Sequence, residues 1–219
     1  MREVTYSRLR AARGLGYPSR MQRVVAGTLR GRRLLSLPKA VSGVRPSSSR
    51  VRGAIFDRLQ REVVGARVLD LFAGSGALAI EALSRGAAHA TLVERQAGLT
   101  RFLAEQLAAL EISARAQVIH DDARRFLSRD RGAQAAFDLV LVDPPYAELD
   151  LYGEVLTKLV EADPRTGASW LAPEAVIVVE YHKHKGRRPA IVVPAGLVSE
   201  AVRDHGQTAL EFFERASQA

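Results

Sequence analysis

The sequence predicts an α/β protein with a mainly parallel sheet and helices on both faces of that sheet. After Gly65, short apolar runs alternate with longer amphipathic segments, as they do in consecutive β-α-β units. The first apolar run ends in a glycine-rich loop, Gly74-Ser75-Gly76, and such loops bind ligands at the carboxyl ends of parallel strands. The length of 219 residues, with 47% hydrophobic and 26% charged residues, indicates one globular domain of ordinary size.

Composition argues against several classes of protein. No apolar run approaches the roughly 20 residues that span a bilayer, and the arginine-rich start has no apolar segment of signal-peptide type. The chain has no cysteine, which excludes disulfides, thiolate metal sites and a cysteine nucleophile. We therefore expect a cytoplasmic protein that neither contacts a membrane nor binds a metal ion.

The net charge of +8 is divided unevenly along the chain. Residues 1–62 contain 15 Lys and Arg against three acidic residues, whereas the rest of the chain contains 17 against 21. A basic segment in front of a mildly acidic body is typical of a protein that holds a polyanion such as a nucleic acid. The alternative is that these arginines only keep the chain soluble.

The basic segment divides into two parts. Residues 1–20 show no sustained apolar period, which predicts a disordered tail and makes Met21 a candidate for the native start. Residues 21–62 are predicted to form a basic RNA-binding hairpin and helix. Two short strands are expected within residues 23–37, and the serines at 47–49 are expected to cap the helix that follows.

Residues 63–219 are predicted to form the sheet domain. Its strands are expected at Arg67–Leu71, Ala90–Glu94, Ala116–His120, Phe137–Val142, Ala175–Glu180, Ala190–Val193 and Ala209–Phe213. Its helices are expected at Gly76–Ser84, Gly98–Leu110, Asp122–Leu127 and Leu151–Val160. In the second of these helices the apolar residues fall mostly on one stripe, as a helix that covers a sheet requires.

The end of the first strand points to a nucleotide-like cofactor. Asp70 precedes a loop that contains Phe72, Gly74 and Gly76, and the helix after this loop presents unpaired N–H groups to a ligand. The Gly-x-Gly-x-x-Ala spacing is shared with dinucleotide-binding folds. The charge of Asp70 would repel a pyrophosphate but attract the cationic amino-acid end of S-adenosylmethionine. We therefore favour S-adenosylmethionine, with NAD as the alternative.

Three further residues are assigned to the cofactor site. Glu94 ends the second strand, 24 residues after Asp70, close to the separation at which an acidic side chain accepts hydrogen bonds from ribose hydroxyls. Asp122, together with the backbone of Ala123, follows the third strand and is a candidate acceptor for the adenine amino group. An Asp at this position is equally suited to be the N-cap of the next helix.

The fourth strand ends in the most specific signal, the run Asp-Pro-Pro-Tyr from Asp143 to Tyr146. The prolines fix the backbone and supply carbonyls without N–H donors. Such a loop suits methylation of an amino group on a nucleobase, because Asp143 and the Pro144 carbonyl can accept the two amino hydrogens. Tyr146 can then stack on the base. Asp143, Pro144 and Tyr146 are the predicted catalytic residues, and Asp143 is also expected to border the cofactor.

These motifs resemble those of the amino-methylating, S-adenosylmethionine-dependent methyltransferases. A finer pattern consists of Arg23-Val24-Val25-Ala26-Gly27, Arg30-Gly31-Arg32, Arg45-Pro46, Arg50-Val51-Arg52, Phe56 and Leu83-Ser84-Arg85-Gly86-Ala87. It resembles the RsmD-like bacterial enzymes, which methylate N2 of a guanine in small-subunit (16S) ribosomal RNA. The resemblance runs from Met21 to the end of the chain. The family usually has an Asp and a Glu where this chain has Ser49 and Gly53.

The resemblance implies a Rossmann-like class I methyltransferase sheet, mainly parallel with an antiparallel last strand, and a small N-terminal extension. It also implies a guanine that is flipped out of the RNA of an assembled or partly assembled small ribosomal subunit. We expect the protein to be a monomer. The residues expected to bind the RNA are Arg23, Arg30, Arg32, Arg33, Arg45, Arg50 and Arg52.

Other functions fit parts of the sequence. A DNA adenine-N6 methyltransferase could use the same Asp-Pro-Pro-Tyr loop, although the chain has no long insertion for a DNA-recognition domain. A nicotinamide-dependent oxidoreductase could use the glycine loop but would leave the Asp-Pro-Pro-Tyr run unexplained. A third alternative is an RNA-binding assembly factor that keeps the cofactor-binding fold but has no catalytic activity. A second basic cluster around His182 and His184 is expected to be a solvated connection between strands rather than a metal site. Contact with RNA phosphate is left open for this cluster.

Overall fold

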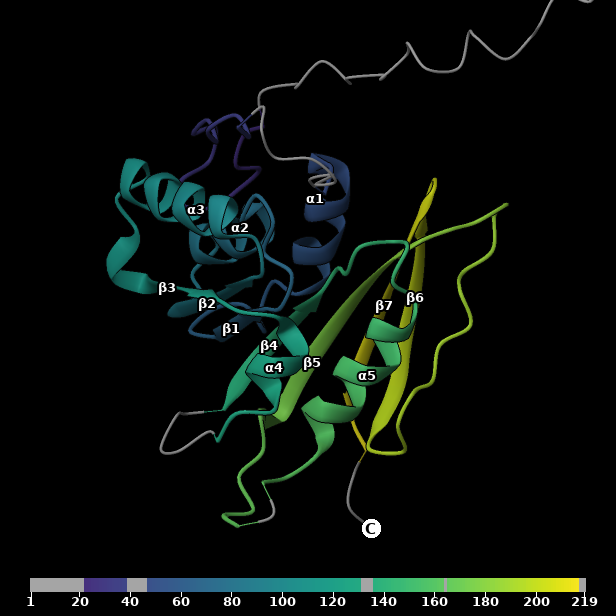
Figure 1. Cartoon of the computed structure of the whole chain (residues 1–219). Helices are drawn as coiled ribbons and strands as arrows, with labels where there is room; N and C mark the ends of the chain where they lie inside the picture. The colour runs from purple at the N-terminus through teal and green to yellow at the C-terminus, as the bar shows by residue number, and fades with distance from the viewer. Residues whose placement is uncertain (1–21, 39–46, 131–135, 164, 217–219) are drawn as a thin grey trace, which may run out of the picture.

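The fold is that of a computed structural model, which describes residues 22–38, 47–130, 136–163 and 165–216 (Figure 1). The predicted tail at 1–20, the candidate start Met21 and the predicted RNA contact Arg45 lie outside these residues. The helices are α1 (Ser49–Arg58), α2 (Ala77–Ser84), α3 (Ala97–Ala109), α4 (Ala123–Leu127) and α5 (Asp150–Val160), with a 3-10 helix at Ser113–Arg115. The strands are β1 (Arg67–Asp70), β2 (His89–Glu94), β3 (Ala116–His120), β4 (Phe137–Val142), β5 (Leu171–His182), β6 (Leu197–His205) and β7 (Thr208–Arg215). No helix in this described part of the chain is long and apolar enough to cross a membrane.

The strands form one sheet in the order β3-β2-β1-β4-β5-β7-β6. The pairs from β3 to β5 are parallel, and β7 is antiparallel to both of its neighbours. The predicted sheet, mainly parallel with an antiparallel last strand, is confirmed. The strand order reverses at β1, between β2 and β4, and such a reversal leaves a crevice at the carboxyl ends of the strands.

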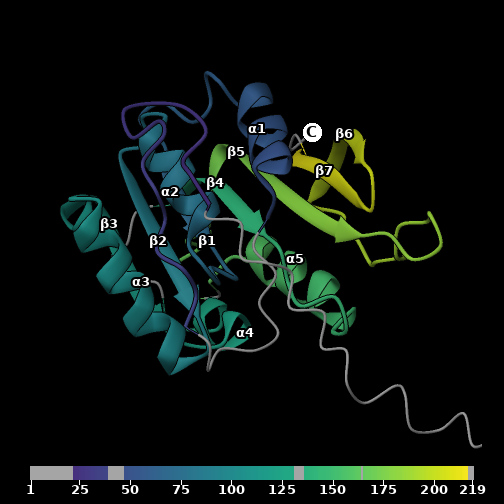
Figure 2. The ribbon, with the colours of Figure 1, turned by 90° about the horizontal axis from the view of Figure 1, so that it is seen from above.

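Helices cover both faces of the sheet, as predicted (Figure 2). Helices α1, α2 and α3 share one hydrophobic core, which includes Leu103, and α4 and α5 share another, which includes Leu156. Neighbouring strand residues alternate between these cores, so that Val68 belongs to the first and Leu69 to the second. Because both faces are buried, the central strands read as continuous apolar runs.

The sixth strand differs from the prediction. The sequence predicts a strand at Ala190–Val193, but the structure is irregular there and places β6 at Leu197–His205. Pro189 and Pro194 bracket the predicted run, and proline lacks the N–H group that a strand ladder needs. The actual β6 is an edge strand with mostly exposed residues, so no apolar run marks its position.

The N-terminal segment is a loop rather than the predicted pair of strands. In the described residues one antiparallel bridge, between Arg23 and Arg33, joins its two arms. The loop is bound to α2 instead, where the Thr28 N–H donates to the Ser84 carbonyl at 2.7 Å. A Cβ at Gly27, whose φ is 82°, would lie 1.9 Å from this carbonyl oxygen, so the contact requires glycine. Backbone hydrogen bonds still join the two arms, but the N–H groups of residues 25, 26, 28 and 29 donate to α2, so the strand pairing is limited to this one bridge.

Helix α1 begins as the sequence predicts. The Ser48 hydroxyl accepts a hydrogen bond from the Val51 N–H at 3.2 Å, which is the interaction that defines an N-cap. On the buried side of the helix, Ile55 and Phe56 belong to the same hydrophobic core as α2 and α3. The predicted boundary at residue 62 therefore lies between two segments that share one core.

Candidate active site

A cavity of about 510 Å³ lies at the carboxyl ends of the parallel strands. Loops after β1, β2, β3 and β4 form its walls, and Ser47 from the N-terminal segment contributes one side chain. The predicted site residues that line it are Phe72, Gly74, Glu94, Asp122, Ala123, Asp143, Pro144 and Tyr146. The structure thus brings together most of the cofactor and catalytic residues predicted from separate motifs, whereas Asp70 and Gly76 are not among the residues that line the cavity.

The two glycines of the first loop have different roles. Gly74 lines the cavity, and its φ of 50° lies in the left-handed region that favours glycine. Gly76, at φ 75°, is the N-cap residue of α2 and faces the core. A Cβ at Gly76 would lie 2.7 Å from Cδ2 of Leu103. The first glycine therefore lets the backbone approach a ligand, whereas the second lets α2 and α3 pack closely.

Asp70 lies beneath this loop and is 2% exposed. It accepts a long hydrogen bond from the Phe72 N–H at 3.4 Å. Burial raises the pKa of Asp70 to about 7; backbone N–H groups of Phe72 and Ala79 oppose this shift, and the charge of Glu94 adds to it. A buried carboxylate with so few donors is stabilised by a cationic ligand.

Glu94 joins the first two loops of the cavity. Its Oε2 accepts from the Gly74 N–H at 3.0 Å, and its Oε1 accepts from the Gln96 N–H at 2.7 Å. Each carboxylate oxygen has a second lone pair. The side chain can therefore hold the glycine loop and still accept a hydrogen bond from a ligand in the cavity.

Asp122 is the N-cap of α4, one of its two predicted roles. Its Oδ1 accepts from the Arg124 N–H at 3.0 Å and from the Arg125 N–H at 3.4 Å. It also lines the cavity with Ala123, and so does the preceding residue, Asp121. Asp121 is buried and pairs with Arg125 and Arg129.

Asp143 belongs to a group of acidic side chains at the ends of β1, β4 and β5. The Ser47 hydroxyl lies 3.2 Å from Oδ2 of Asp143 and 2.9 Å from Oε2 of Glu180. Burial raises the pKa of Asp143 well above its usual range; the charges of Glu180 and Asp70 add to this shift, and the hydrogen bond from Ser47 opposes it. The site therefore favours a ligand that brings hydrogen-bond donors or positive charge to Asp143.

Tyr146 lines the cavity and is supported by a second ring. Its ring stacks on that of His182, with centroids 4.6 Å apart and planes 23° apart. His182 ends β5 and is absent from the cavity wall in the described residues. It therefore supports Tyr146 from outside the cavity.

Sequence reasoning missed Ser47 and Glu180. Ser47 lies in a serine run that a capping role already explained, and Glu180 lies within an apolar strand, where an acid carries no local signal. Only the pairing of β4 with β5 shows that Glu180 is close to Asp143. The sequence predicts that His182 lies in a solvated cluster, whereas in the structure its ring contacts Tyr146. Within the described residues, no group of three or more His, Cys, Asp or Glu side chains could hold a metal ion.

One predicted RNA contact is wrong. Arg52 is 1% exposed; its guanidinium donates to the carbonyls of Ser47 and Arg23, at 2.7 Å each. It also lies 3.8 Å from Oε2 of Glu81, whose two oxygens accept the N–H groups of Val25 and Ala26. Arg52 therefore joins the N-terminal segment to α2 and is not accessible to RNA.

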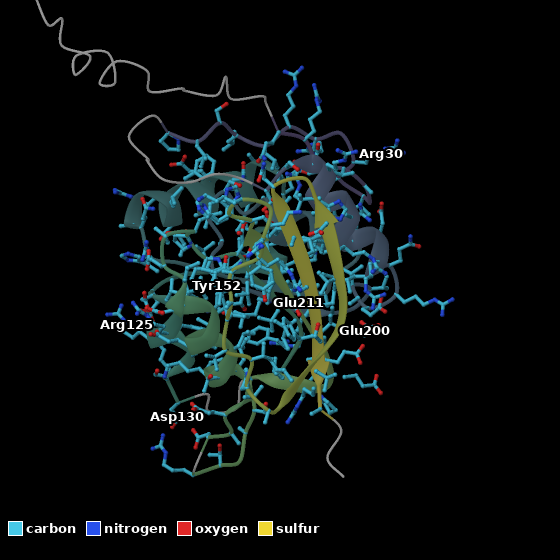
Figure 3. The ribbon with its side chains drawn as sticks, turned by 90° about the vertical axis from the view of Figure 1, so that its right-hand side faces the viewer. Arg30, Arg125, Asp130, Tyr152, Glu200 and Glu211 are labelled. Atoms are coloured by element: carbon cyan, nitrogen blue, oxygen red, sulfur yellow. The ribbon has the colours of Figure 1, made fainter. Side chains whose placement is uncertain are left out.

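The other described arginines of the basic segment are exposed. The guanidinium of Arg23 donates to the Gly31 carbonyl at 2.8 Å, and that of Arg32 donates to the Ala109 carbonyl at 3.0 Å. In the described part of the chain no side-chain partner is recorded for Arg30, Arg33 or Arg50. Figure 3 labels Arg30 at the outer edge of the molecule.

Comparison with known proteins decides the family. The model of the family described as "Conserved hypothetical protein 95" matches residues 22–214. The chain belongs to this family. This result confirms the RsmD-like family predicted from the sequence.

Several relatives of the chain are named as ribosomal RNA methyltransferases. The chain is 37% identical over 196 residues to "Ribosomal RNA small subunit methyltransferase D" of Escherichia coli strain K12, covering 90% of this chain and 91% of the relative. The Haemophilus influenzae protein of the same name is 36% identical over 164 residues, covering 74% and 80%. The solved structure of Escherichia coli yhhF, a proposed methyltransferase, has a TM-score of 0.73 at 35% identity and covers 90% of this chain and 98% of that one.

Proposed function

We propose that this protein transfers a methyl group from S-adenosylmethionine to the exocyclic N2 amino group of a guanine in small-subunit ribosomal RNA. The observation that carries the proposal is that Asp143, Pro144 and Tyr146 share one cavity with the glycine loop and Glu94. A cofactor site and a site for a planar amine are therefore adjacent. The names of the relatives support ribosomal RNA of the small subunit as the substrate.

The residues of the cavity fit S-adenosylmethionine better than a dinucleotide. Asp70 and Glu94 place two buried carboxylates beside the glycine loop. Their charge would repel a pyrophosphate, whereas it attracts the ammonium and sulfonium groups of S-adenosylmethionine. We assign Asp70 to the ammonium end, Glu94 to the ribose hydroxyls, and Asp122 with Ala123 to the adenine edge. When bound, the cofactor supplies an electrophilic methyl group on sulfur.

The chain's own residues prepare the amine for attack on that methyl group. The guanine N2 lone pair is delocalised into the ring, which makes this nitrogen a poor nucleophile. Asp143 and the carbonyl of Pro144 accept its two hydrogens, so that the lone pair points toward the methyl carbon. Tyr146 stacks on the flipped base and holds it in line. Methylation would form the N–C bond as the S–C bond breaks and S-adenosylhomocysteine leaves, and the nitrogen would lose one proton, which the Asp143 carboxylate can accept. The contribution of the chain is therefore positioning and electrostatic stabilisation.

The exposed basic residues extend the site to the RNA backbone. We assign Arg30, Arg33 and Arg50 to phosphate contacts because they are exposed and no side-chain partner is recorded for them in the described residues. Arg23 and Arg32 are exposed as well, and each guanidinium keeps further N–H donors for this purpose. A monomer acting on assembling small subunits in the cytoplasm is consistent with this assignment.

Cofactor binding is expected to depend on pH through Asp70. Its pKa in the folded protein is raised to about 7, so the carboxylate becomes charged as the pH rises through this value. The affinity for S-adenosylhomocysteine, whose ammonium group we assign to Asp70, should therefore weaken up to about tenfold as the pH falls from 7 to 6. Isothermal titration calorimetry from pH 5.5 to 8.5 measures this dependence.

Two variants test the assignment to Asp70. Asp70→Asn should bind S-adenosylhomocysteine more weakly at pH 8, and its affinity should depend less on pH than that of the wild type. The pH dependence that remains would come from titration of Asp143. Asp57→Asn, at an exposed position on α1, should behave like the wild type. A profile of Asp70→Asn that is as steep as the wild type would contradict the role of Asp70.

The proposed function is tested by methyl transfer and by ligand protection together. Radiolabelled S-adenosylmethionine should label small ribosomal particles from a strain that lacks the activity, and the label should be found in RNA. S-adenosylhomocysteine should raise the melting temperature of the protein, whereas NADH should not. Protection by NADH alone would indicate an oxidoreductase, and protection by S-adenosylhomocysteine without transfer to RNA would indicate an inactive assembly factor.

A further inference from the structure

We propose that the connection between β5 and β6 contains a second RNA-binding element, which contacts phosphates beside the flipped guanosine. This element is the basic turn, defined as residues 183–188. The inference rests on the proposed function because it assumes an RNA substrate. It adds a contact surface outside the N-terminal segment, to which the sequence assigned the RNA contacts.

The basic turn begins where the candidate active site ends. His182 is the last residue of β5, and its ring stacks on Tyr146, the proposed platform for the base. Lys185 is three residues further along, so its Cα lies within roughly 11 Å of that of His182. Its flexible side chain extends this reach. A nucleotide whose base stacks on Tyr146 therefore has its neighbouring phosphates within range of the basic turn.

The backbone of the turn is well defined. His184 and Arg187 exchange two backbone hydrogen bonds, of 2.9 and 3.0 Å. Between them, Lys185 and Gly186 both have positive φ, of 47° and 78°. This is the pattern of a two-residue hairpin turn, which holds its central residues at the tip. Figure 2 shows the connection projecting beyond the end of β5, away from α2 and α3.

Charge pairing divides the cations of the turn into two groups. At its base, Lys183 pairs with Asp204 at 3.1 Å and Arg188 pairs with Glu211 at 2.8 Å. Toward the tip, Lys185 and Arg187 are exposed, and among the described residues no ion pair is recorded for either of them. The ion pairs at the base fix the turn to β6 and β7, while the two remaining cations are available to an anionic partner.

The two basic surfaces come from different parts of the fold. The N-terminal arginines belong to the loop that packs on α2 and to α1, whereas the basic turn continues from the end of β5 (Figure 1), where the His182 ring stacks on Tyr146. Extruding a base from structured RNA costs the free energy of unstacking that base. Phosphate contacts on both sides of the extruded nucleotide would offset this cost more effectively than contacts on one side. A phosphate backbone is therefore the partner that these positions fit.

The test is a comparison of charge-neutralised variants of the full chain. Lys185→Gln combined with Arg187→Gln removes the two tip cations and keeps both ion pairs at the base. The control, Arg165→Gln, removes an exposed arginine that lies near the amino end of β5, outside the N-terminal segment and away from the cavity, and that pairs with Asp130. Binding to small ribosomal particles is measured from 50 to 300 mM KCl, and cofactor binding is measured with S-adenosylhomocysteine.

We expect the tip variant to bind the particles roughly tenfold more weakly at 150 mM salt. The slope of log K against log salt should become shallower by about 1.5 to 2, close to one unit for each phosphate that the variant no longer neutralises. Its affinity for S-adenosylhomocysteine and its melting temperature should match those of the wild type and the control. A tip variant with the affinity and salt slope of the control would overturn this inference alone. A wild-type protein that neither binds nor methylates the particles would overturn the proposed function as well.

Discussion

Replacement of Asp143 by Ala is expected to lower the rate of methyl transfer by about two to three orders of magnitude, the range seen when one preorganised electrostatic group is removed from an active site. The amine would lose the carboxylate that accepts one of its hydrogens. The affinity for S-adenosylhomocysteine should change only a few-fold, because Asp70 and Glu94 remain in place. Single-turnover transfer to small ribosomal particles and calorimetric titration measure the two effects separately.

Two further variants make this result specific. Asp143→Asn should retain more activity than Asp143→Ala, because its amide oxygen still accepts one hydrogen bond. The wild-type rate should rise with pH, since the pKa of Asp143 is raised well above its usual range and its protonated form accepts fewer hydrogens. The rate of Asp143→Asn should not show this rise with pH, because an amide side chain does not titrate. Asp150→Ala, at an exposed position in α5, is the control; equal rates for Asp143→Ala and this control would remove the proposed role of Asp143.

Replacement of Arg52 by Ala is expected to destabilise the fold by about 3–5 kcal/mol, the usual cost of removing one partner of a buried ion pair. Glu81 would keep its buried charge and lose the nearby guanidinium, although Arg85 and two backbone N–H groups remain bound to it. The carbonyls of Ser47 and Arg23 would also lose a donor. The free energy of unfolding, measured in urea, tests this expectation.

Arg50 provides the matched control for Arg52. It lies on the same helix two positions earlier, is exposed, and has no recorded side-chain partner in the described residues. Arg50→Ala should change the free energy of unfolding by no more than about 0.5 kcal/mol while weakening RNA binding. If both variants unfold at the same urea concentration, Arg52 does not join the N-terminal segment to α2 in the way described.

The sheet could be predicted from the sequence because both of its faces are buried. β3 and β4 have the predicted bounds, and β1, β2 and β7 agree within two residues at each end. β6 could not be predicted because most of its residues are exposed and no continuous apolar run marks it. The run at Ala190–Val193 was misleading for the opposite reason: it is apolar, but prolines on both sides keep it out of the sheet. Burial of the central strands, rather than strand propensity alone, therefore made the prediction possible.

The candidate site was predictable where its residues lie at the ends of strands. Asp70, Glu94 and Asp143 each follow an apolar run, and parallel strands bring such positions together. Ser47 and Glu180 could not be found this way, because their closeness to Asp143 depends on tertiary packing. Arg52 shows the converse case: a basic residue within a basic segment is indistinguishable from an RNA contact until its burial is known.

The central claim is that a carboxylate and a proline carbonyl orient a guanine amino group toward a methyl donor. The most direct test is to digest the methylated RNA to nucleosides and identify the product by mass spectrometry against synthetic standards. We predict N2-methylguanosine from small ribosomal particles incubated with the wild-type protein, and none with Asp143→Ala. Detection of N6-methyladenosine instead, or of no methylated nucleoside at all, would contradict this account.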